Sequence, residues 1–530
     1  MALQPYVLSN ADILDEIFQW FEYEHTHGHS LVDTITHTGY DTSTDAETAR
    51  RRCLASAARV CKAFQEPALR ILWRQLESLL PFFILLPSFT KVQENVEQPF
   101  GWTSRDIFHL PDHLSLYEWA RLRKYAAYVR ILYFSSPPAV KPQDLTPESW
   151  TSLKVLFGDR PVFPNLRVLQ WGAEWPDTEL PGIAHFLSPT VDLLLLSCCT
   201  HPHQRFLEYG PKWQALLPQI IRTICERATG LSHLMTCMGQ LNASELVTTL
   251  SLNHPPTFRG LTLYGQYETP PLSLSSFMDL ARITSLETLT INVPVDCSSR
   301  IALPSALDLP NLRHLRIPIH RESCPAYDII TSARLQSLHI HHMEYSSVSY
   351  LRQVCSIWAR SFPNLEVLSF WLTPTESQGG APTCSLLAAI SPLLDLPHMR
   401  TFILHTVSTP LTIEDADLTA LSQAWPSLTE LHISGMSTPD YCAGSTVGVP
   451  GLLSLATNCP HLTALSVNTI VLRPEDVSVL PASPVNHGLK ALQVVRGIAP
   501  GAYRLVRERL FPQISLQLHG DDREDGSYYA

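Results

Sequence analysis

One short apolar motif recurs along most of this chain and limits the folds that it can adopt. The motif has the form Leu-x-x-Leu-x-apolar, and its clearest copies are Leu286–Ile291, Leu312–Ile317 and Leu365–Phe370. From Leu166 to Leu489, first positions are separated by a mean of about 29 residues, which is a repeat period of solenoid folds. Further copies begin at Val129, Val191, Leu231, Phe258, Leu335, Met399, Leu428 and Leu462.

Proline turns and helical patterns lie between these copies, so strands and helices alternate. Proline introduces several copies, as at Pro164 and Pro310, because it ends a helix and favours extended backbone before it. Apolar residues have helical spacing in 348–358 and in 418–425. The pattern predicts an α/β leucine-rich-repeat solenoid over residues 128–518, with parallel strands on the concave side and helices outside. A doubly wound α/β domain is the alternative, because it also alternates strands with helices.

The composition is that of a globular chain without a basic face. The 530 residues are 45% apolar and 16% charged, with a net charge of −11. A nucleic-acid partner would need a concentration of Lys and Arg, and the sequence has no long basic run. The 12 cysteines show no paired spacing, which favours a reducing compartment. No segment has the apolar length of a membrane span, so we expect a soluble protein of the cytoplasm or nucleus.

Three short amphipathic patterns lie close to the N-terminus, in residues 12–21, 54–64 and 66–76. Each places apolar residues three and four positions apart, which is the helical period. A bundle of three such helices cannot bury all of its apolar surface alone, and this is common in docking modules. We expect Trp73 to pack the third helix onto the first two.

These segments resemble the F-box, the motif by which substrate receptors of cullin-type ubiquitin ligases dock on a Skp adaptor. The resemblance rests on residues 12–14, 17–18, 60–64 and 72–73. The continuation at 79–81 is similar to that of F-box proteins from mushroom-forming fungi. The resemblance implies an adaptor-binding surface formed by Ile13, Leu14, Ile17, Phe18, Val60, Cys61, Leu72 and Trp73.

The resemblance and the repeat pattern together divide the chain. The F-box-like module covers residues 8–80 and carries a polar insert at 24–52, which we expect to be a flexible loop. At 9–10 the chain has Ser-Asn where the family usually has Leu-Pro. Residues 81–127 are expected to be a linker with one linking helix, and residues 519–530 a mobile acidic tail.

No motif in the sequence indicates catalysis. A glycine-rich phosphate loop, a Gly-x-Ser-x-Gly elbow and a His-Glu-x-x-His pair are all absent from it. Cys198, Cys199, His201 and His203 are the one metal-like cluster, but they are too crowded for a zinc finger. Buried thiols and solvated histidines are the preferred interpretation. We therefore expect neither enzyme activity nor a metal or other cofactor.

An F-box followed by leucine-rich repeats implies a substrate-recognition subunit of a Skp-cullin-F-box ubiquitin ligase. By this resemblance, the first module binds a Skp-type adaptor and, through it, a cullin. The repeats bind a protein substrate, and the partners supply the ubiquitin chemistry. The contribution of the chain to rate would be to hold a substrate lysine near the donor. A leucine-rich-repeat scaffold with no ligase role is the alternative.

Strand geometry indicates where a substrate would bind. Side chains alternate along a strand, so the leucines of the motif point inward and its third and fifth positions face outward. These outward positions form a polar stripe of Thr288, Thr290, His314, Arg316, Ser337, His339, Glu430 and His432. Neighbouring strands lie about 4.8 Å apart, so we expect Arg316 and His339 to be near neighbours that could bind an acidic or phosphorylated segment. A merely solvated polar face is the alternative.

Overall fold

The computed structural model describes most of the chain, which forms two compact units. The first unit consists of residues 1–241 and 253–257, and the second of residues 242–252 and 258–530. The described residues are 11–19, 44–98, 101–134, 144–145, 147–172, 182–197, 206–237, 242–265, 269–296, 306–320, 328–345, 347–374, 384–407, 411–436, 447–470, 480, 487–498, 504 and 506–518.

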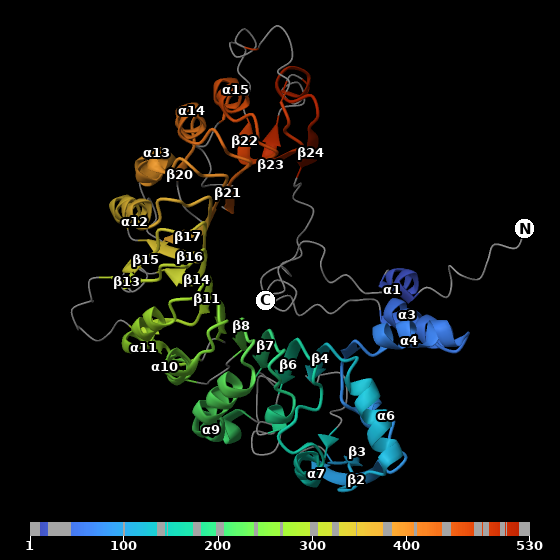
Figure 1. Ribbon diagram of the computed structural model, residues 1–530. Coiled ribbons are helices and arrows are strands. Elements are labelled where there is room, and N and C mark those ends of the chain that lie inside the picture. Colours follow the sequence, from blue (N-terminus) through green and yellow to red (C-terminus); the bar gives the residue numbers. More distant parts are fainter. Residues whose placement is uncertain are drawn as a thin grey trace, which may run out of the picture. The chain divides into compact units, whose positions relative to one another are not determined.

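Three helices, α1 (Ala11–Gln19), α3 (Thr44–Ala57) and α4 (Lys62–Leu72), form an N-terminal module in the first unit (Figure 1). The rings of Phe18 and Phe64 meet edge to face with their centroids 5.7 Å apart, which is a favourable arrangement of aromatic pairs. The three predicted helices are therefore present, although their ends differ from the prediction. Their common core consists of Leu14, Phe18, Leu54 and Ala68.

The predicted polar insert at 24–52 is wrong at its C-terminal end. Its last residues belong to α3, which begins at Thr44. Ala, Arg and Glu residues favour this helix by intrinsic propensity. Its first half has no regular apolar spacing, which is the pattern that predicted the other helices. The helix ends at Ala57, so Val60 and Cys61 lie outside it. The remainder of the predicted insert lies outside the described residues.

Residues 81–127, predicted as a linker with one helix, contain more regular structure than expected. The linking helix is present as α6 (Leu116–Ala126). It follows the short helix α5 (Leu80–Phe83) and an antiparallel hairpin of β2 (Thr90–Gln98) and β3 (Gly101–His109). Backbone pairing stabilises this hairpin, and its sequence has no clear apolar alternation that would predict strands.

Glu118 fixes the start of α6. Its buried carboxylate accepts hydrogen bonds from the hydroxyl and backbone nitrogen of Ser88 and of Ser115. The Ser115 hydroxyl accepts a bond from the backbone nitrogen of Glu118, which completes a capping box. The hydrogen bonds from Ser88 and Ser115 hold the pKa of Glu118 at about 2. This carboxylate is therefore ionised and has a structural role.

The repeats of the first unit form a parallel sheet in which neighbouring strands follow the order of the chain. The strands after β1 lie at copies of the predicted motif. Leu76, expected in the third helix, lies instead in β1, which is too short to display a motif. The strands are β1 (Gln75–Leu76), β4 (Ile131–Phe134), β6 (Val168–Gly172), β7 (Leu193–Ser197) and β8 (His233–Cys237).

The second unit has the same design, and its neighbouring strands also pair in parallel. The middle leucines of the motif, such as Leu289, Leu315 and Leu338, are Cα partners on neighbouring strands and are at most 1% exposed. Each fully buried leucine contributes about 1.5–3 kcal/mol. The strands are β9 (Gly260–Tyr264), β11 (Thr288–Asn292), β14 (His314–His320), β16 (Ser337–Tyr345), β17 (Val367–Pro374), β19 (Thr401–Val407), β21 (Glu430–Met436), β22 (Ala464–Ile470), β23 (Ala491–Ile498) and β24 (Ser515–Leu518).

Within each unit, helices lie along one side of the sheet (Figure 1). The helical patterns predicted at 348–358 and 418–425 are confirmed, and Trp358 and Trp425 are buried beneath them. The parallel sheet and its helices give the chain the α/β, solenoid-like repeat architecture that the motif predicts. The helices are α7 (Pro147–Phe157), η2 (Ile183–His185) and α9 (Phe206–Arg227) in the first unit, and α10 (Ala243–Asn253), α11 (Leu274–Asp279), η3 (Leu280–Arg282), α12 (Val348–Ser361), α13 (Leu386–Ile390), η5 (Ser391–Asp395), α14 (Asp415–Ala424), α15 (Val449–Asn458) and η7 (Val506–Leu510) mainly in the second.

Short strand pairs take the place of helices in part of the second unit. Between η3 and α12, the described residues contain no helix, and β13 (Leu307–Asp308) pairs with β15 (Ile330–Thr331). Similar two-residue pairs precede other helices. They are β10 (Leu272–Ser273) with β12 (Val295–Asp296), and β18 (Cys384–Ser385) with β20 (Leu411–Thr412). In the first unit, β5 (Asp144–Leu145) pairs with β3.

The proline turns join one repeat to the next. Asn165, Asn311 and Asn364 each follow a turn proline, and each side-chain amide donates to a backbone carbonyl one repeat earlier. The three bonds measure 2.9, 2.8 and 2.8 Å. They satisfy carbonyl groups that would otherwise need water or another partner. The asparagines after these prolines therefore help to fix the spacing of neighbouring repeats.

Candidate functional site

The residues predicted to bind an adaptor do not form one exposed surface. On α1, Leu14 and Phe18 are 1% and 5% exposed and belong to the core of the N-terminal module. Ile13 is half-buried, whereas Ile17 is 43% exposed. Residues four apart share a helix face, so the helix carries one buried stripe and one accessible stripe. The prediction is therefore corrected for Leu14 and Phe18, which α3 and α4 already cover.

The turn between α3 and α4 carries a second accessible group. Val60 is 70% exposed, and Cys61, the N-cap residue of α4, is also exposed. Leu72, another predicted contact, packs in a partly buried position against the core of the module. An apolar side chain as exposed as that of Val60 is poorly solvated by water. Exposed apolar groups that cluster commonly mark binding surfaces.

Trp73 has a different position from the predicted one. It follows α4 as its C-cap residue, and its ring lies 4.7 Å from that of Tyr125 on α6. Beside it, the Tyr128 hydroxyl donates to Oε1 of Glu66 at 2.6 Å, and Lys124 Nζ lies 3.2 Å from Oε2 of Glu66. Trp73 therefore joins α4 to α6, and the prediction that it packs α4 onto the first two helices is wrong.

In the second unit, the face of the sheet turned away from the helices carries the predicted polar stripe. The predicted alternation is confirmed, because Leu338 and Ile340 are buried while His339 between them is half-buried. Thr290 and Ser337 are 6% and 7% exposed, and the other predicted residues are more accessible. We call this surface the helix-free face of the second unit, and its residues include Thr288, Thr290, His314, Arg316, Ser337, His339, His341, Ser369, Trp371, His405, Glu430, His432 and Ser434.

The predicted neighbours Arg316 and His339 are Cα partners on β14 and β16, as expected. Their side chains, however, make different hydrogen bonds. Arg316 Nε donates to Nε2 of His341 at 2.8 Å, and His339 shares a 2.8 Å bond with the Ser337 hydroxyl. A ring nitrogen that accepts from a guanidinium carries no proton, so His341 is neutral in this pair. The basic residue Arg316 is therefore held by His341, which lies two residues beyond the predicted partner His339 on β16.

An aromatic centre on this face was not predicted. Trp371 on β17 lies between His342 and His405, with ring centroids 5.9 and 4.9 Å away. His405 Nδ1 also hydrogen-bonds the Ser434 hydroxyl at 2.7 Å. Trp371 directly follows Phe370, the last apolar position of its motif, because the strand continues beyond the motif. If the alternation of inward and outward side chains is extended beyond Phe370, it places Trp371 on the outward face.

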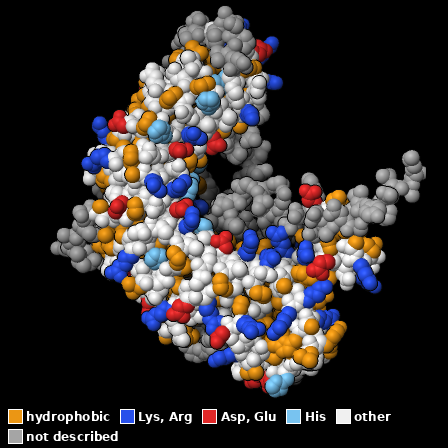
Figure 2. Space-filling view, in the orientation of Figure 1, with side chains coloured by type: hydrophobic (Ala, Val, Ile, Leu, Met, Phe, Trp, Pro, Cys, Tyr) orange, Lys and Arg blue, Asp and Glu red, His pale blue; other side chains and the backbone are white. Residues whose placement is uncertain are grey.

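Burial lowers the pKa of three histidines of this face, His314, His405 and His432, and so favours their neutral form. It lowers the pKa of His405, which neighbouring His432 lowers further. Burial also lowers the pKa of His432, although the charge of Glu430 raises it. The pKa of His314 is lowered as well, and burial is again the largest cause. The face thus presents imidazoles, hydroxyls and an indole, with Arg316 and Glu430 among its charged groups. Figure 2 shows acidic, basic and histidine side chains interspersed over the second unit.

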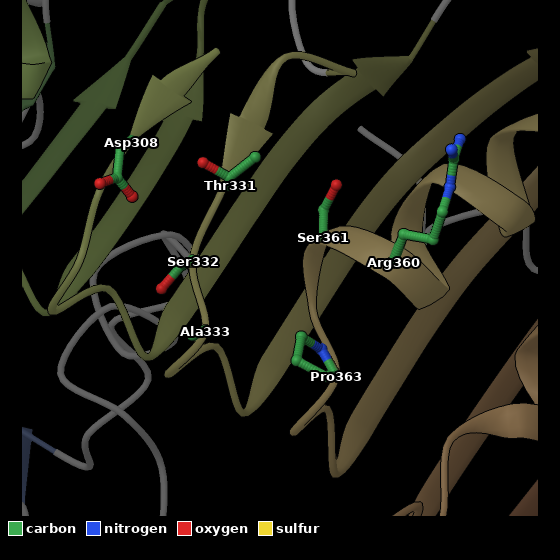
Figure 3. A pocket seen from close by; sticks show the side chains of 7 residues that line it. All are labelled: Asp308, Thr331, Ser332, Ala333, Arg360, Ser361 and Pro363. Carbon is green, nitrogen blue, oxygen red and sulfur yellow. The ribbon is translucent and has the colours of Figure 1, made fainter.

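A polar hollow of about 440 Å³ lies on the helix side of the second unit, where β13 and β15 take the place of a helix. Figure 3 shows Asp308 and Arg360 at its opposite ends, with the hydroxyls of Thr331 and Ser361 between them. These groups do not converge on one point, so the hollow lacks the mutual geometry of a catalytic site. Its remaining lining residues are Ser332, Ala333 and Pro363.

The described residues form no metal centre, because no three of their His, Cys, Asp or Glu side chains are arranged to hold an ion. The cluster noted at residues 198–203 lies outside the described residues. In the described part of the chain, no helix combines the length and apolar composition needed to cross a bilayer. The free cysteines found there are Cys53, Cys61, Cys225, Cys237, Cys355 and Cys459.

Comparisons with known proteins identify no family for this chain. No protein-family model and no curated protein matches it. Among solved structures, 52 chains match. One of these is described as "Crystal structure of Rad7 and Elc1 complex in yeast", with 15% sequence identity. The match covers 65% of this chain and 70% of that chain at a TM-score of 0.31, a value too low to support an argument about function.

Proposed function

We propose that this protein is a substrate-recognition subunit of a Skp-cullin-F-box ubiquitin ligase. In this proposal, the N-terminal module is an F-box that binds a Skp-type adaptor, and the repeats are leucine-rich repeats that bind a protein substrate. The observation that supports it most is one chain combining a three-helix module that exposes Ile17 and Val60 with parallel repeat sheets. Such a combination suits binding at two places, and we propose no catalytic role for the chain itself.

The proposed adaptor surface is smaller than the sequence suggests. Leu14 and Phe18 stabilise the core, so the accessible residues are Ile17, Val60 and Cys61, with Ile13 half-buried. Apolar side chains of this kind form the centre of protein interfaces, where they are removed from water. An adaptor that covers Ile17 and Val60 would bury apolar surface that the free chain leaves in contact with water.

The proposed substrate surface is the helix-free face of the second unit. It combines an aromatic group, Trp371, with a guanidinium, Arg316, and these residue types dominate binding energy at interfaces. The guanidinium of Arg316 can bind a carboxylate or phosphate through charge-assisted hydrogen bonds. The adaptor and cullin would supply the ubiquitin chemistry, and binding would place a substrate lysine near the donor. Free thiols such as Cys355 suit the cytoplasm or nucleus, where we propose that the protein acts.

Co-purification with a Skp-type adaptor tests the proposal. The informative variant is Ile17→Asp with Val60→Asp, because both side chains are exposed and their replacement leaves the core intact. A carboxylate buried without a partner at an apolar interface costs several kcal/mol, and every 1.4 kcal/mol is tenfold in affinity. We expect adaptor affinity to fall by roughly a hundredfold or more, while the thermal unfolding profile stays unchanged.

The matched control is Leu252→Asp, which places the same charge at an apolar side chain that is 62% exposed on α10. We expect it to bind the adaptor like the natural chain. If the natural chain does not bind a Skp-type adaptor at all, the ligase proposal fails and the scaffold alternative remains. If the Ile17 and Val60 variant binds normally, the docking surface lies elsewhere.

A further inference from the structure

The residues that immediately precede the repeat strands lie next to one another across the sheet. Backbone bonds connect these residues in the first unit. The nitrogen of Arg130 donates to the carbonyl of Arg74, that of Arg167 to Arg130, and that of Asp192 to Arg167, each at 2.8 Å. Parallel neighbours are about 4.8 Å apart, so side chains at this position form a ladder across the strands.

In the first unit, this ladder begins with arginine on three neighbouring strands. We call Arg74, Arg130 and Arg167 the arginine ladder, and they precede β1, β4 and β6. Long stretches of sequence separate the three residues, and only the parallel pairing brings them together. Figure 2 shows Lys and Arg side chains gathered around β4 and α6 of this unit. Positive charge is therefore concentrated locally in a chain whose net charge is −11.

Arg130, in the middle of the ladder, shows the effect of this concentration. It is half-buried, and its Nη1 donates to the backbone carbonyl of Asn165 at 3.2 Å. Burial lowers its pKa, and the charges of Arg167 and Arg74 lower it further. An arginine stays protonated under such conditions, so Arg130 and Arg167 are neighbouring positive charges that repel one another. A bound anion would relieve that repulsion.

At the same position in the second unit, two arginines have acidic partners on neighbouring strands. Arg259 Nη1 lies 3.0 Å from Oε1 of Glu287, and Arg400 Nε lies 3.5 Å from Oε2 of Glu366. In the first unit, the next acid after the arginines is Asp192, and its carboxylate accepts a bond from the Ser232 hydroxyl. Among the described residues, no carboxylate forms an ion pair with Arg130 or Arg167.

Apolar side chains lie beside the arginine ladder. Ile131 and Val168 directly follow Arg130 and Arg167, and both are half-buried on the side of the sheet opposite to Leu132 and Leu169. We call this surface the helix-free face of the first unit. Its residues are Ile131, Tyr133, Val168, Gln170, Leu193, Leu195, His233 and Met235.

We propose that the arginine ladder binds a phosphate monoester carried on a protein segment, whose neighbouring apolar residues lie on Ile131 and Val168. Guanidinium groups bind phosphate oxygens in pairs of parallel hydrogen bonds, and arginines on adjacent strands are close enough to share one phosphate. Ile131 and Val168 are half-buried, so a peptide that contacts them gains apolar contacts that a free ion lacks. This site is distinct from the substrate surface proposed above and does not depend on a ligase role.

A nucleic acid is a poorer fit to the same residues. Its affinity rises with the number of phosphates that a protein contacts, so it needs basic groups along an extended path. Here the ladder continues after Arg167 into Asp192 and Ser232, and the next strand therefore adds no positive charge. The ladder offers positive charge for a short segment with one or two phosphates.

The test measures binding of the full chain to an array of peptides. Each peptide carries a central phosphoserine or phosphothreonine between varied residues, and an unphosphorylated copy serves as its comparison. Hydrogen bonds to charged groups are strong enough that we expect roughly a tenfold or greater preference for the best phosphopeptides. The double variant Arg130→Gln with Arg167→Gln should lose this preference. Arg130→Lys with Arg167→Lys keeps the charge but not the paired geometry, and should retain only part of it.

The matched control is Arg259→Gln with Arg400→Gln, which removes two arginines from the same ladder position in the second unit. It should bind the phosphopeptides like the natural chain. Arg167→Glu provides a second test, because Arg167 is exposed and its replacement should leave folding unchanged. Inorganic phosphate and a single-stranded oligonucleotide serve as competing probes. Equal binding to both peptide forms, no bound phosphopeptide, tighter binding of either competing probe, or an unchanged double variant would each overturn the proposal.

Discussion

The helix-free faces of the two units share a parallel strand arrangement but differ in the polarity of their side chains. In the first unit, the outward positions of the strands carry mainly apolar residues, such as Ile131, Val168 and Leu195. In the second unit, the equivalent positions carry hydroxyls, imidazoles and Arg316. Both units bury the same middle leucines beneath the helices, with exposures of at most 1%. The fold therefore requires the inward positions to be apolar and leaves the outward positions free to suit a partner.

The arginine ladder sharpens this contrast. At the position before each strand, the second unit places acids beside arginines, as in Arg259 with Glu287. The first unit instead places Arg130 beside Arg167. Surface ion pairs stabilise a fold by no more than about 1 kcal/mol, so neither arrangement is needed for folding. The difference between the units is therefore one of local charge.

The strongest expected effect tests whether inward positions are equivalent in the two units. Leu169→Ala in the first unit and Leu338→Ala in the second each remove a fully buried side chain. We expect each to lower the free energy of unfolding by about 2–5 kcal/mol, because a cavity remains. Urea denaturation measures the change. The outward control Ser369→Ala should change it by less than about 0.5 kcal/mol, and a comparable loss in the control would remove the distinction between the faces.

The next effect concerns binding by the helix-free face of the second unit. Arg316→Glu with His341→Glu reverses its basic group, and we expect the yield of proteins captured by the repeats to fall at least about tenfold, because like charges oppose an acidic partner. Quantitative mass spectrometry of co-purified proteins measures it. Arg352→Glu, at an exposed position of α12, makes the same arginine-to-glutamate change on the helix side and should leave capture unchanged. Equal yields from both variants would move the binding surface away from this face.

The smallest expected effect is the part of the pH dependence of stability that comes from three histidines of the second unit. The folded state lowers the pKa of His314, His405 and His432 from 6.5, so the unfolded state binds more protons just below that pH. Their contribution to stability is complete above about pH 6.5 and decreases as the pH falls through the lowered values. His405→Gln with His432→Gln should therefore weaken the pH dependence of the melting temperature between about pH 5 and about pH 7.5. An unchanged pH profile would show that these histidines do not contribute to it.

The sequence by itself determined the repeat architecture. Strands beginning at or within each predicted motif copy, from β4 to β23, are present, as are the helices at 348–358 and 418–425. The outward positions of the second unit, including Arg316 beside His339 in register, were also predictable. These features follow from local periodicity, because a strand repeats every two residues and a helix every 3.6 residues wherever they occur. Burial of the leucines follows from the same periods.

Only the tertiary structure decided which distant segments meet. The ladder of Arg74, Arg130 and Arg167 exists because β1, β4 and β6 pair in parallel, and no local period connects these residues. For the same reason, the contact of Trp73 with Tyr125 was not predicted. On α1, the helical period placed Leu14 and Ile17 in one apolar set, and the packing of α3 and α4 separated them. Periodicity reports the geometry of one segment, whereas the choice between core and surface depends on which other segments cover it.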